Sequence, residues 1–242
     1  MDMKSSLAGK TVVVLGGSSG IGLATARAAR AVGASVIITG RDAARLSKAV
    51  ASLGGDSQSA CFDAAEEASA RAFFESLEGF DHLFTTAGTL VHDAHLAPSC
   101  AALAPALDVR FWSAVHACKY GAPRMRAGGS FVFMSGTAGT RPLAGAAVAS
   151  GSCAAVESFA RAMALDLAPL RVNAVAPGYV DTPLFDALLG DQRDAVLKAA
   201  GEKLPVGRVG RPEEIADAVL FLMRNAYVNG ITLTVDGGGL LV

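Results

Sequence analysis

Short apolar segments alternate with longer amphipathic segments along this chain. The apolar segments have the length and composition of β-strands, and they cover residues 11–15, 35–39, 58–62, 80–86, 130–134, 171–175 and 231–235. The amphipathic segments, in which apolar residues recur at helical spacing, cover 20–32, 42–53, 66–77, 101–125, 145–167 and 212–222. Strands that alternate with helices pair in parallel, because each helix carries the chain back across one face of the sheet. The pattern therefore predicts an α/β fold, a doubly wound parallel sheet with helices on both faces.

The chain has the size and composition of one folded unit. It has 242 residues, of which 52% are hydrophobic and only 18% are charged, so most of it must be buried. It contains no linker and no low-complexity tract, and we predict a single domain over residues 1–242. Residues 179–205 lie outside the predicted elements, and a segment of this length is typical of a lid over a substrate site.

Charge and cysteine usage narrow the class of partner and the compartment. Lys and Arg number 21 against 22 Asp and Glu, and neither sign gathers in one segment, which argues against nucleic acid and membrane surfaces as partners. The longest run without a charged residue, 11–26, is interrupted by four glycines and does not have the pattern of a membrane span. The first residues lack the apolar stretch of a secretory signal, and the four cysteines are scattered. We expect a reduced, cytoplasmic environment.

A glycine-rich turn joins the first predicted strand to the first predicted helix. Its candidate cofactor-binding residues are Gly16, Ser18, Ser19, Gly20, Ile21 and Gly22. Glycines let the main chain approach a pyrophosphate closely, and the start of a helix directs amide groups at it. Glycine also serves any tight turn, so the motif takes its meaning from the rest of the chain.

The spacing Gly-x-x-x-Gly-x-Gly of this turn resembles that of the short-chain dehydrogenase/reductase family, whose members bind a nicotinamide dinucleotide there. Asp63 and Ala64, after the third predicted strand, match the place of the family's adenine-contacting aspartate. Ala87 and Gly88 end a segment that stands where the family has Asn-Asn-Ala-Gly. The residues that the resemblance assigns to the nicotinamide end are Pro177, Gly178, Val180 and Thr182.

Residues 236–238, Asp-Gly-Gly, are similar to the family's C-terminal signature. The resemblance thus covers nearly the whole chain in several dispersed motifs. It implies a Rossmann-like fold, a nicotinamide cofactor, a small-molecule substrate and no metal. In the family, helices equivalent to 101–125 and 145–167 pair with those of a neighbouring subunit, and both segments are apolar here, so we expect a homodimer or homotetramer.

The end of the second predicted strand indicates which nicotinamide cofactor is used. Proteins of this fold that prefer NAD carry an acidic residue at this place, which accepts from the ribose hydroxyls and repels a 2′-phosphate. This chain has Gly40 and then Arg41. A guanidinium can donate two parallel hydrogen bonds to a phosphate, so the sequence favours NADP(H). The alternative interpretation of Arg41 is a solvated arginine at the start of a helix.

The resemblance fails at the residues that carry the family's chemistry, which are a serine, a tyrosine, a lysine and an asparagine. Aligned by the flanking motifs, the serine position holds Gly136, the tyrosine position Ala149 and the lysine position Cys153. The asparagine position holds Arg110. Neither tyrosine nor lysine occurs between Tyr120 and Tyr179, so no shift of the alignment restores the pair.

Arg110 and Ser135 are the remaining candidates for catalytic residues. Arg110 lies among apolar neighbours and could take over the missing lysine's electrostatic task, or form an ion pair with a carboxylate such as Asp108. Ser135 is one place early, and could touch substrate or serve a local turn. Cys153 fits a core position, and the group His92, Asp93 and His95 has no distant third metal ligand and fits a polar loop better than a metal site.

Two functions are compatible with this pattern. The first is an NADP(H)-dependent oxidoreductase with weak or unusual proton transfer, acting on an electrophilic carbonyl such as a quinone, for which solvent can supply the proton. The second is a non-catalytic NADP(H)-binding protein, a pseudoenzyme that acts as a sensor or scaffold. Cofactor-free lyase or dehalogenase chemistry fits less well, because the phosphate-binding turn is intact.

Overall fold

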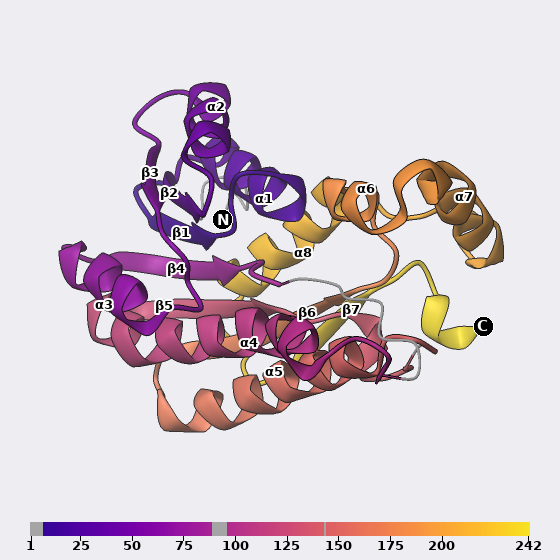
Figure 1. Cartoon of the computed structure of the whole chain (residues 1–242). Helices are drawn as coiled ribbons and strands as arrows, with labels where there is room; N and C mark the ends of the chain where they lie inside the picture. Colours follow the sequence, from indigo (N-terminus) through magenta and orange to yellow (C-terminus); the bar gives the residue numbers. More distant parts are fainter. Residues whose placement is uncertain (1–6, 89–95, 143) are drawn as a thin grey trace.

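The computed structural model describes residues 7–88, 96–142 and 144–242, which form one sheet between two layers of helices (Figure 1). The seven strands are all parallel, in the order β3-β2-β1-β4-β5-β6-β7. Their bounds are β1 Thr11–Leu15, β2 Ser35–Gly40, β3 Gln58–Cys61, β4 Phe80–Thr85, β5 Met125–Met134, β6 Arg171–Pro177 and β7 Thr232–Val235. This order reverses direction between β1 and β4, so it confirms the predicted doubly wound sheet.

Helices cover both faces of the sheet (Figure 1). The first layer contains α1 (Gly20–Ala31), α2 (Ala43–Leu53) and α8 (Pro212–Arg224), and the second contains α3 (Glu67–Ser76), α4 (Cys100–His116) and α5 (Ala147–Asp166). Both faces of the central strands are buried, since Val12 and Val14 of β1 pack into the first layer and Val13 packs into the second. Among the described residues, no helix is both long and apolar enough to cross a membrane.

The structure differs most from the predicted elements in two places, and β5 begins at Met125, five residues before the predicted strand. The helix predicted to run to residue 125 ends at His116 and continues as a π-helical turn, Ala117–Gly121, before a short 3₁₀ turn and β5. Gly121 and Pro123 disfavour a longer α-helix there. The predicted loop 179–205 contains two helices, α6 (Pro183–Leu189) and α7 (Arg193–Lys203). Only Leu197 and Gly201 of α7 are buried, so the segment has no broad apolar stripe that would have identified it.

A buried polar row crosses β4, β5 and β6 near the amino end of β6. His82 of β4, Ser130 of β5 and Arg171 of β6 are aligned by the strand register. The His82 ring is bonded through Nδ1 to the Ser130 hydroxyl at 2.9 Å. Arg171 donates to the carbonyls of Leu222 and Met223 at the end of α8. Burial, and next the positive charge of Arg171, lower the pKa of His82 to about 4.

We therefore predict that His82 makes the folded state sensitive to acid. The unfolded histidine, with its pKa near 6.5, binds a proton before the folded one does as the pH falls, so the free energy of unfolding falls between pH 6.5 and 4. The loss from this residue between pH 7 and pH 5 is about 2 kcal/mol. Urea unfolding of the wild type and His82→Asn at both pH values measures it. Equal pH dependence in the two proteins would contradict the prediction.

Candidate functional site

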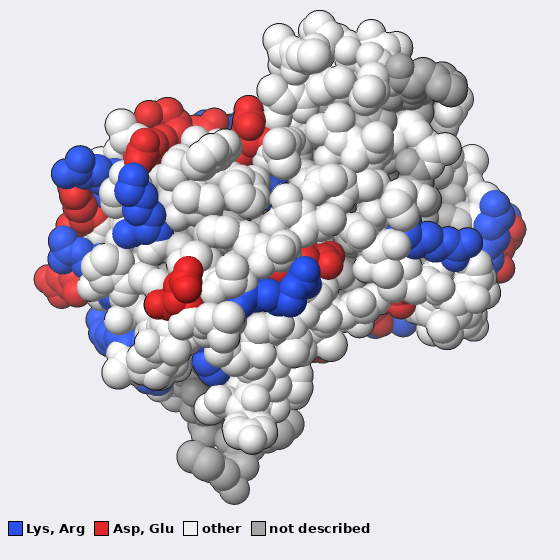
Figure 2. Space-filling model, turned by 90° about the horizontal axis from the view of Figure 1, so that it is seen from below, with Lys and Arg blue, Asp and Glu red and all other residues white. Residues whose placement is uncertain are grey.

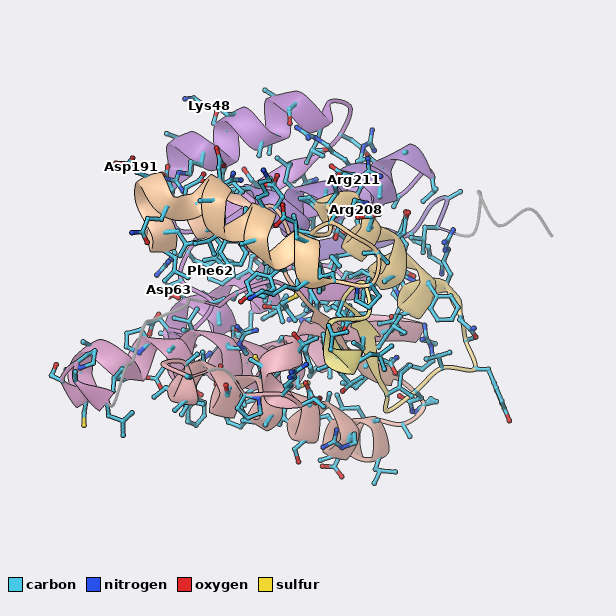
Figure 3. The ribbon with its side chains drawn as sticks, turned by 90° about the vertical axis from the view of Figure 1, so that its right-hand side faces the viewer. Lys48, Phe62, Asp63, Asp191, Arg208 and Arg211 are labelled. Atoms are coloured by element: carbon cyan, nitrogen blue, oxygen red, sulfur yellow. The ribbon has the colours of Figure 1, made fainter. Side chains whose placement is uncertain are left out.

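The carboxyl ends of the parallel strands meet at one edge of the sheet, and the predicted cofactor-binding residues lie there. Figure 3 looks onto this edge, with Phe62 and Asp63 of the β3 end labelled and the helix pair α6–α7 crossing in front. In an open α/β sheet this edge, next to the point where the strand order reverses, is where ligands bind. The site is therefore built from loops that rigid strands hold in place.

The glycine turn has a geometry that only glycines permit. The amides of Gly16 and Gly17 donate to the Thr39 carbonyl at 3.0 and 2.9 Å, which ties the turn to β2. Gly16 has a φ of +87°. A Cβ at Gly22 would lie 2.2 Å from the Gly16 carbonyl oxygen, so any side chain there would displace the turn.

The start of α1 fits an anionic group. The first amides of a helix, here those of Gly20, Ile21 and Gly22, have no acceptor within the helix. The Ser19 side chain, at the N-cap position, does not cap them. A pyrophosphate needs a main chain that it can approach closely and amides that can donate to it. The glycine turn provides the first, and the start of α1 provides the second. The turn thus fits the phosphates of a dinucleotide.

The ends of β2 and β3 form the side of the site where the sequence predicts the adenosine. A Cβ at Gly40 would be 3.5 Å from the Ser18 hydroxyl, so this strand end lies against the glycine turn. The Arg41 side chain is 68% exposed and its Nη1 lies 3.9 Å from an Asp63 carboxylate oxygen. The other Asp63 oxygen accepts from the Ala65 amide at 2.9 Å. Arg41 is thus held loosely and is free to bind a phosphate.

His116 holds the chain that follows Asp63, and the sequence analysis missed it. Its ring is 5% exposed, and its Nδ1 lies 3.0 Å from the Ala64 carbonyl oxygen, to which it donates. The bond joins α4 to the loop after β3, across 52 positions of sequence. A histidine within a predicted helix gave no signal for this contact.

The end of β4 and the segment after β6 close around the glycine turn. The Thr86 hydroxyl donates to the Gly16 carbonyl at 2.9 Å, and the Ala87 amide donates to the Thr85 hydroxyl at 3.2 Å. Thr182 lies next to Gly20, where a Cβ would be 3.5 Å from the Thr182 side chain. These contacts bring the predicted residues of the two halves of the chain together at one site.

The remaining residues predicted for the nicotinamide end form a continuous path from β6 to α6. Pro177 ends β6, and Gly178 packs so closely on Asp236 that a Cβ would be 2.9 Å from the Asp236 Cβ. Val180 forms a parallel bridge with Gly210, which fixes the segment beside the start of α8. The backbone from Pro177 to Thr182 is therefore held at a defined place over the strand ends.

Arg110 lies inside the site rather than on the surface of α4. Its side chain is 7% exposed, and it donates from Nη1 to the carbonyls of Met134 and Ser135, at 2.9 and 3.2 Å. Its Nε donates to the Ser152 hydroxyl at 3.2 Å. Among the described residues no carboxylate is paired with it, so the ion pair with Asp108 that the sequence left open is not formed.

One nitrogen of Arg110 remains available. Nη2 has no acceptor in the described part of the chain, and it would be 3.2 Å from a Cβ at Gly88. Nη2 of Arg110 is not among the fully enclosed side-chain atoms that lack a hydrogen bond in the described residues. The group therefore keeps access to solvent beside the carboxyl end of β4.

The Ser135 hydroxyl is directed at α5. It donates to a Glu157 carboxylate oxygen at 2.5 Å, and the Cys153 carbonyl oxygen, the alternative acceptor, lies 3.3 Å away; Ser135 is 4% exposed. Glu157 is also buried, and a Cβ at Gly139 would be 2.9 Å from its carboxylate. Sequence reasoning missed Glu157, because a glutamate on a helix is usually solvated.

Small residues fill the centre of the site between β5 and α5. Ala149 and Cys153 are each 3% exposed, and a Cβ at Gly136 would lie 3.4 Å from the Cys153 sulfur. Lys119 and Tyr120 lie elsewhere and both donate to Glu67 of α3, at 2.7 and 2.5 Å, which lowers the pKa of Glu67 to about 2. The predicted polar loop with His92, Asp93 and His95 lies outside the described residues. Within the described ranges, no group of three potential metal ligands is found.

The helices α6 and α7 extend over the carboxyl edge and are held together by charge. Arg193 at the start of α7 is paired with three carboxylates, those of Asp181, Asp186 and Asp194. These acidic partners, led by the hydrogen bond to Asp194, raise the pKa of Arg193. The Tyr179 ring stacks on Phe185 with a centroid separation of 6.0 Å. The segment is thus an ordered cover rather than an open loop.

Comparisons with known proteins agree on the family to which this chain is similar. Residues 16–239 match the family model described as enoyl-(acyl carrier protein) reductase. The chain is 35% identical to the short-chain dehydrogenase/reductase ucsE of an Acremonium species, over 96% of each chain.

Two solved structures are similar over nearly their full length. The first is MalC reductase/Diels-Alderase from Malbranchea aurantiaca, with a TM-score of 0.91 and 30% identity, covering 99% of this chain and 100% of that one. The second is a small-chain dehydrogenase in complex with NADPH, with a TM-score of 0.83 and 33% identity, covering 96% and 99%.

Proposed function

Because the chain belongs to the short-chain dehydrogenase/reductase family, we propose that it is an NADP(H)-dependent oxidoreductase that reduces an electrophilic carbonyl by a non-standard mechanism. The observation that carries this proposal is the buried Arg110 guanidinium, which keeps one nitrogen free beside Gly88 at the strand ends. The glycine turn and the free amides of α1 support the cofactor. The similar structure that contains NADPH supports the choice of NADP(H).

We propose that the family's four catalytic positions are all substituted here, by Arg110, Gly136, Ala149 and Cys153. The packing of Gly136 against Cys153 supports the alignment, since both lie where β5 meets α5. Glycine and alanine side chains have no acidic proton to donate, and the Cys153 thiol is buried where β5 meets α5. The guanidinium cannot donate a proton because its pKa is far above neutral pH.

The proposed reaction therefore needs a substrate whose reduced oxygen is a weak base. The bound cofactor would supply the hydride, and this chain supplies orientation and charge. Nη2 of Arg110 would donate to the substrate oxygen as negative charge develops on it, and solvent would provide the proton afterwards. A quinone meets this requirement, because its reduced oxygen is a phenolate. In this scheme the Ser135 hydroxyl donates to Glu157 and does not touch the substrate.

The alternative is a non-catalytic NADP(H)-binding protein. The small residues at 136, 149 and 153 favour it, because they remove the family's proton donor. The deciding experiment follows NADPH oxidation at 340 nm with a panel of quinones and ordinary ketones, alongside a binding titration. Turnover with quinones supports the oxidoreductase, whereas tight binding without any turnover supports the alternative.

We predict that NADPH binds about ten- to a hundredfold more tightly than NADH, because a hydrogen bond to a charged group contributes about 1.5–3 kcal/mol. Arg41→Ala should remove most of this difference and leave NADH binding unchanged. Arg45→Ala is the matched control, because Arg45 is an exposed arginine four positions later whose partner is Asp42. Fluorescence titration of both cofactors measures the effect. Equal affinities in the wild type would show that the assignment of NADP(H) is wrong.

We predict a homodimer or homotetramer assembled through α4 and α5. An apolar groove of about 380 Å³ lies between them, lined by Val115, Cys118, Lys119, Ala122, Pro123, Phe159, Met163 and Leu167. Uncharged residues make up most of this face of the molecule (Figure 2). Trp112 of α4 is 46% exposed. Such an apolar surface is typical of an interface.

Light scattering at micromolar concentration tests this assembly. We expect an oligomer for the wild type and a smaller species for Met163→Arg, which places a charge in the groove. A monomeric wild type would contradict the prediction.

We further propose that residues 179–205, with α6 and α7, form the lid over the substrate. The position of this segment over the carboxyl edge supports it.

A further inference from the structure

Arg110 carries a positive charge that its neighbours do not neutralise. Its three hydrogen-bond partners, two carbonyls and one hydroxyl, are all uncharged. The buried carboxylate connected to it is that of Glu157, which is reached only through Ser135. Other buried charges of the described chain, those of Asp81 and Arg171, belong to the amino ends of β4 and β6, at the opposite edge of the sheet. A buried cation with neutral partners repels further positive charge strongly.

The position of Arg110 determines which part of the cofactor would feel this charge. The glycine turn, Arg41 and Asp63 follow β1, β2 and β3, so they belong to the adenosine half of the sheet. Arg110 contacts the end of β5 and lies beside Gly88, after β4. A dinucleotide lies across the two halves of such a sheet, so the β4–β6 half faces the nicotinamide.

The nicotinamide ring changes charge during the reaction. The oxidised ring carries one positive charge, and the reduced ring is neutral. A fixed guanidinium near this half disfavours the oxidised form and leaves the reduced form unaffected. The adenine and the phosphates are the same in both forms, so their contacts cancel when the two affinities are compared.

We propose that Arg110 makes the site select the reduced nicotinamide cofactor over the oxidised one, and that Glu157 offsets part of this selection. The proposal rests on cofactor binding as proposed above, and it does not require turnover. In an enzyme it favours reduction of substrate and release of the oxidised cofactor. In a non-catalytic protein it would make occupancy report the ratio of reduced to oxidised cofactor.

Two charge-removing variants should act in opposite directions. Arg110→Gln removes the cation, so it should strengthen NADP⁺ binding relative to NADPH. Glu157→Gln removes the anion, while its side-chain oxygen can still accept from Ser135, so it should weaken NADP⁺ binding relative to NADPH. A merely structural role of either residue would change both affinities alike and leave their ratio unchanged.

The experiment measures the dissociation constants of NADPH and NADP⁺ by calorimetry for the wild type and both variants. We expect the NADP⁺/NADPH ratio of constants to fall about fivefold or more in Arg110→Gln, a typical coupling between neighbouring charges. It should rise about twofold in Glu157→Gln, whose charge is farther away. The same direction of change is expected for NADH and NAD⁺. Binding of 2′,5′-ADP, which lacks the nicotinamide, should not change.

An unchanged ratio in folded Arg110→Gln would overturn the inference and leave the proposed function in place. So would a ratio that moves in the same direction in both variants. If Arg110→Gln does not fold, the change in Glu157→Gln gives an independent test of the same charge effect, and an unchanged ratio there overturns the inference. Failure of the wild type to bind any of these nucleotides would overturn the proposed function as well.

Discussion

Arg110→Ala should lower the turnover of quinones by about 10²–10³ at saturating NADPH, the usual effect of removing one donor to a developing oxyanion. The side chain is rigidly held, since three hydrogen bonds from Nε and Nη1 fix the guanidinium plane. Its free Nη2 therefore needs little reorganisation as charge appears on the substrate. The loss should appear in kcat, because the interaction strengthens in the transition state.

The pH dependence and a matched control separate this role from a structural one. The wild-type rate should show no inflection between about pH 6 and 9, since an arginine does not titrate there. Arg110→Ala also leaves buried carbonyls without a donor, which should lower the free energy of unfolding by about 1–3 kcal/mol. Arg161→Ala, which changes an exposed arginine on α5, should alter neither property. Unchanged turnover in a folded Arg110→Ala would show that the side chain is structural.

The second large effect is expected on the affinity for NADPH when the glycine turn is changed. Gly22→Ala should weaken NADPH binding by more than about 100-fold, because its Cβ would be 2.2 Å from the Gly16 carbonyl oxygen. The contact is with main chain, which cannot move aside without opening the turn that we propose binds the phosphates. Calorimetric titration of NADPH measures the effect, together with the melting temperature of the variant.

Gly151→Ala provides the control for this substitution. Gly151 is an exposed glycine in α5, and nothing lies within 4 Å of the position that a Cβ would take. Alanine there should raise stability by about 0.5–1 kcal/mol, because glycine is unfavourable within a helix, and should leave NADPH binding unchanged. NADPH binding by Gly22→Ala at wild-type affinity would contradict the assignment of the turn.

The sequence by itself determined the parts of this protein that depend on local chemistry. The apolar segment 11–15 became β1 with the predicted bounds, because a run of buried β-branched residues fits a central parallel strand. The glycine turn followed from the spacing of glycines after that strand. Conformation at Gly16 and Gly22 is constrained within a few residues, so the motif was visible in the linear order.

The bounds of weaker elements needed the tertiary structure. The helix expected up to residue 125 ended at His116, and two helices appeared within 179–205. Periodicity reports which face of a segment is apolar, but α7 covers an edge and buries little. Its first turn carries Asp194, an acidic residue that suits the start of a helix, and Asp194 pairs with Arg193.

The tertiary structure alone decided the environment of the candidate site. From the sequence, Arg110 could take over the missing lysine's electrostatic task or form an ion pair. Its actual partners, Met134, Ser135 and Ser152, lie 24, 25 and 42 positions away along the chain. The pairing of Ser135 with Glu157 was likewise invisible, because it depends on how α5 packs on the end of β5. A single sequence records which residue types are present and how they alternate. Which charges are buried together, and which stay unpaired, is fixed only when the strands and helices bring distant residues into contact.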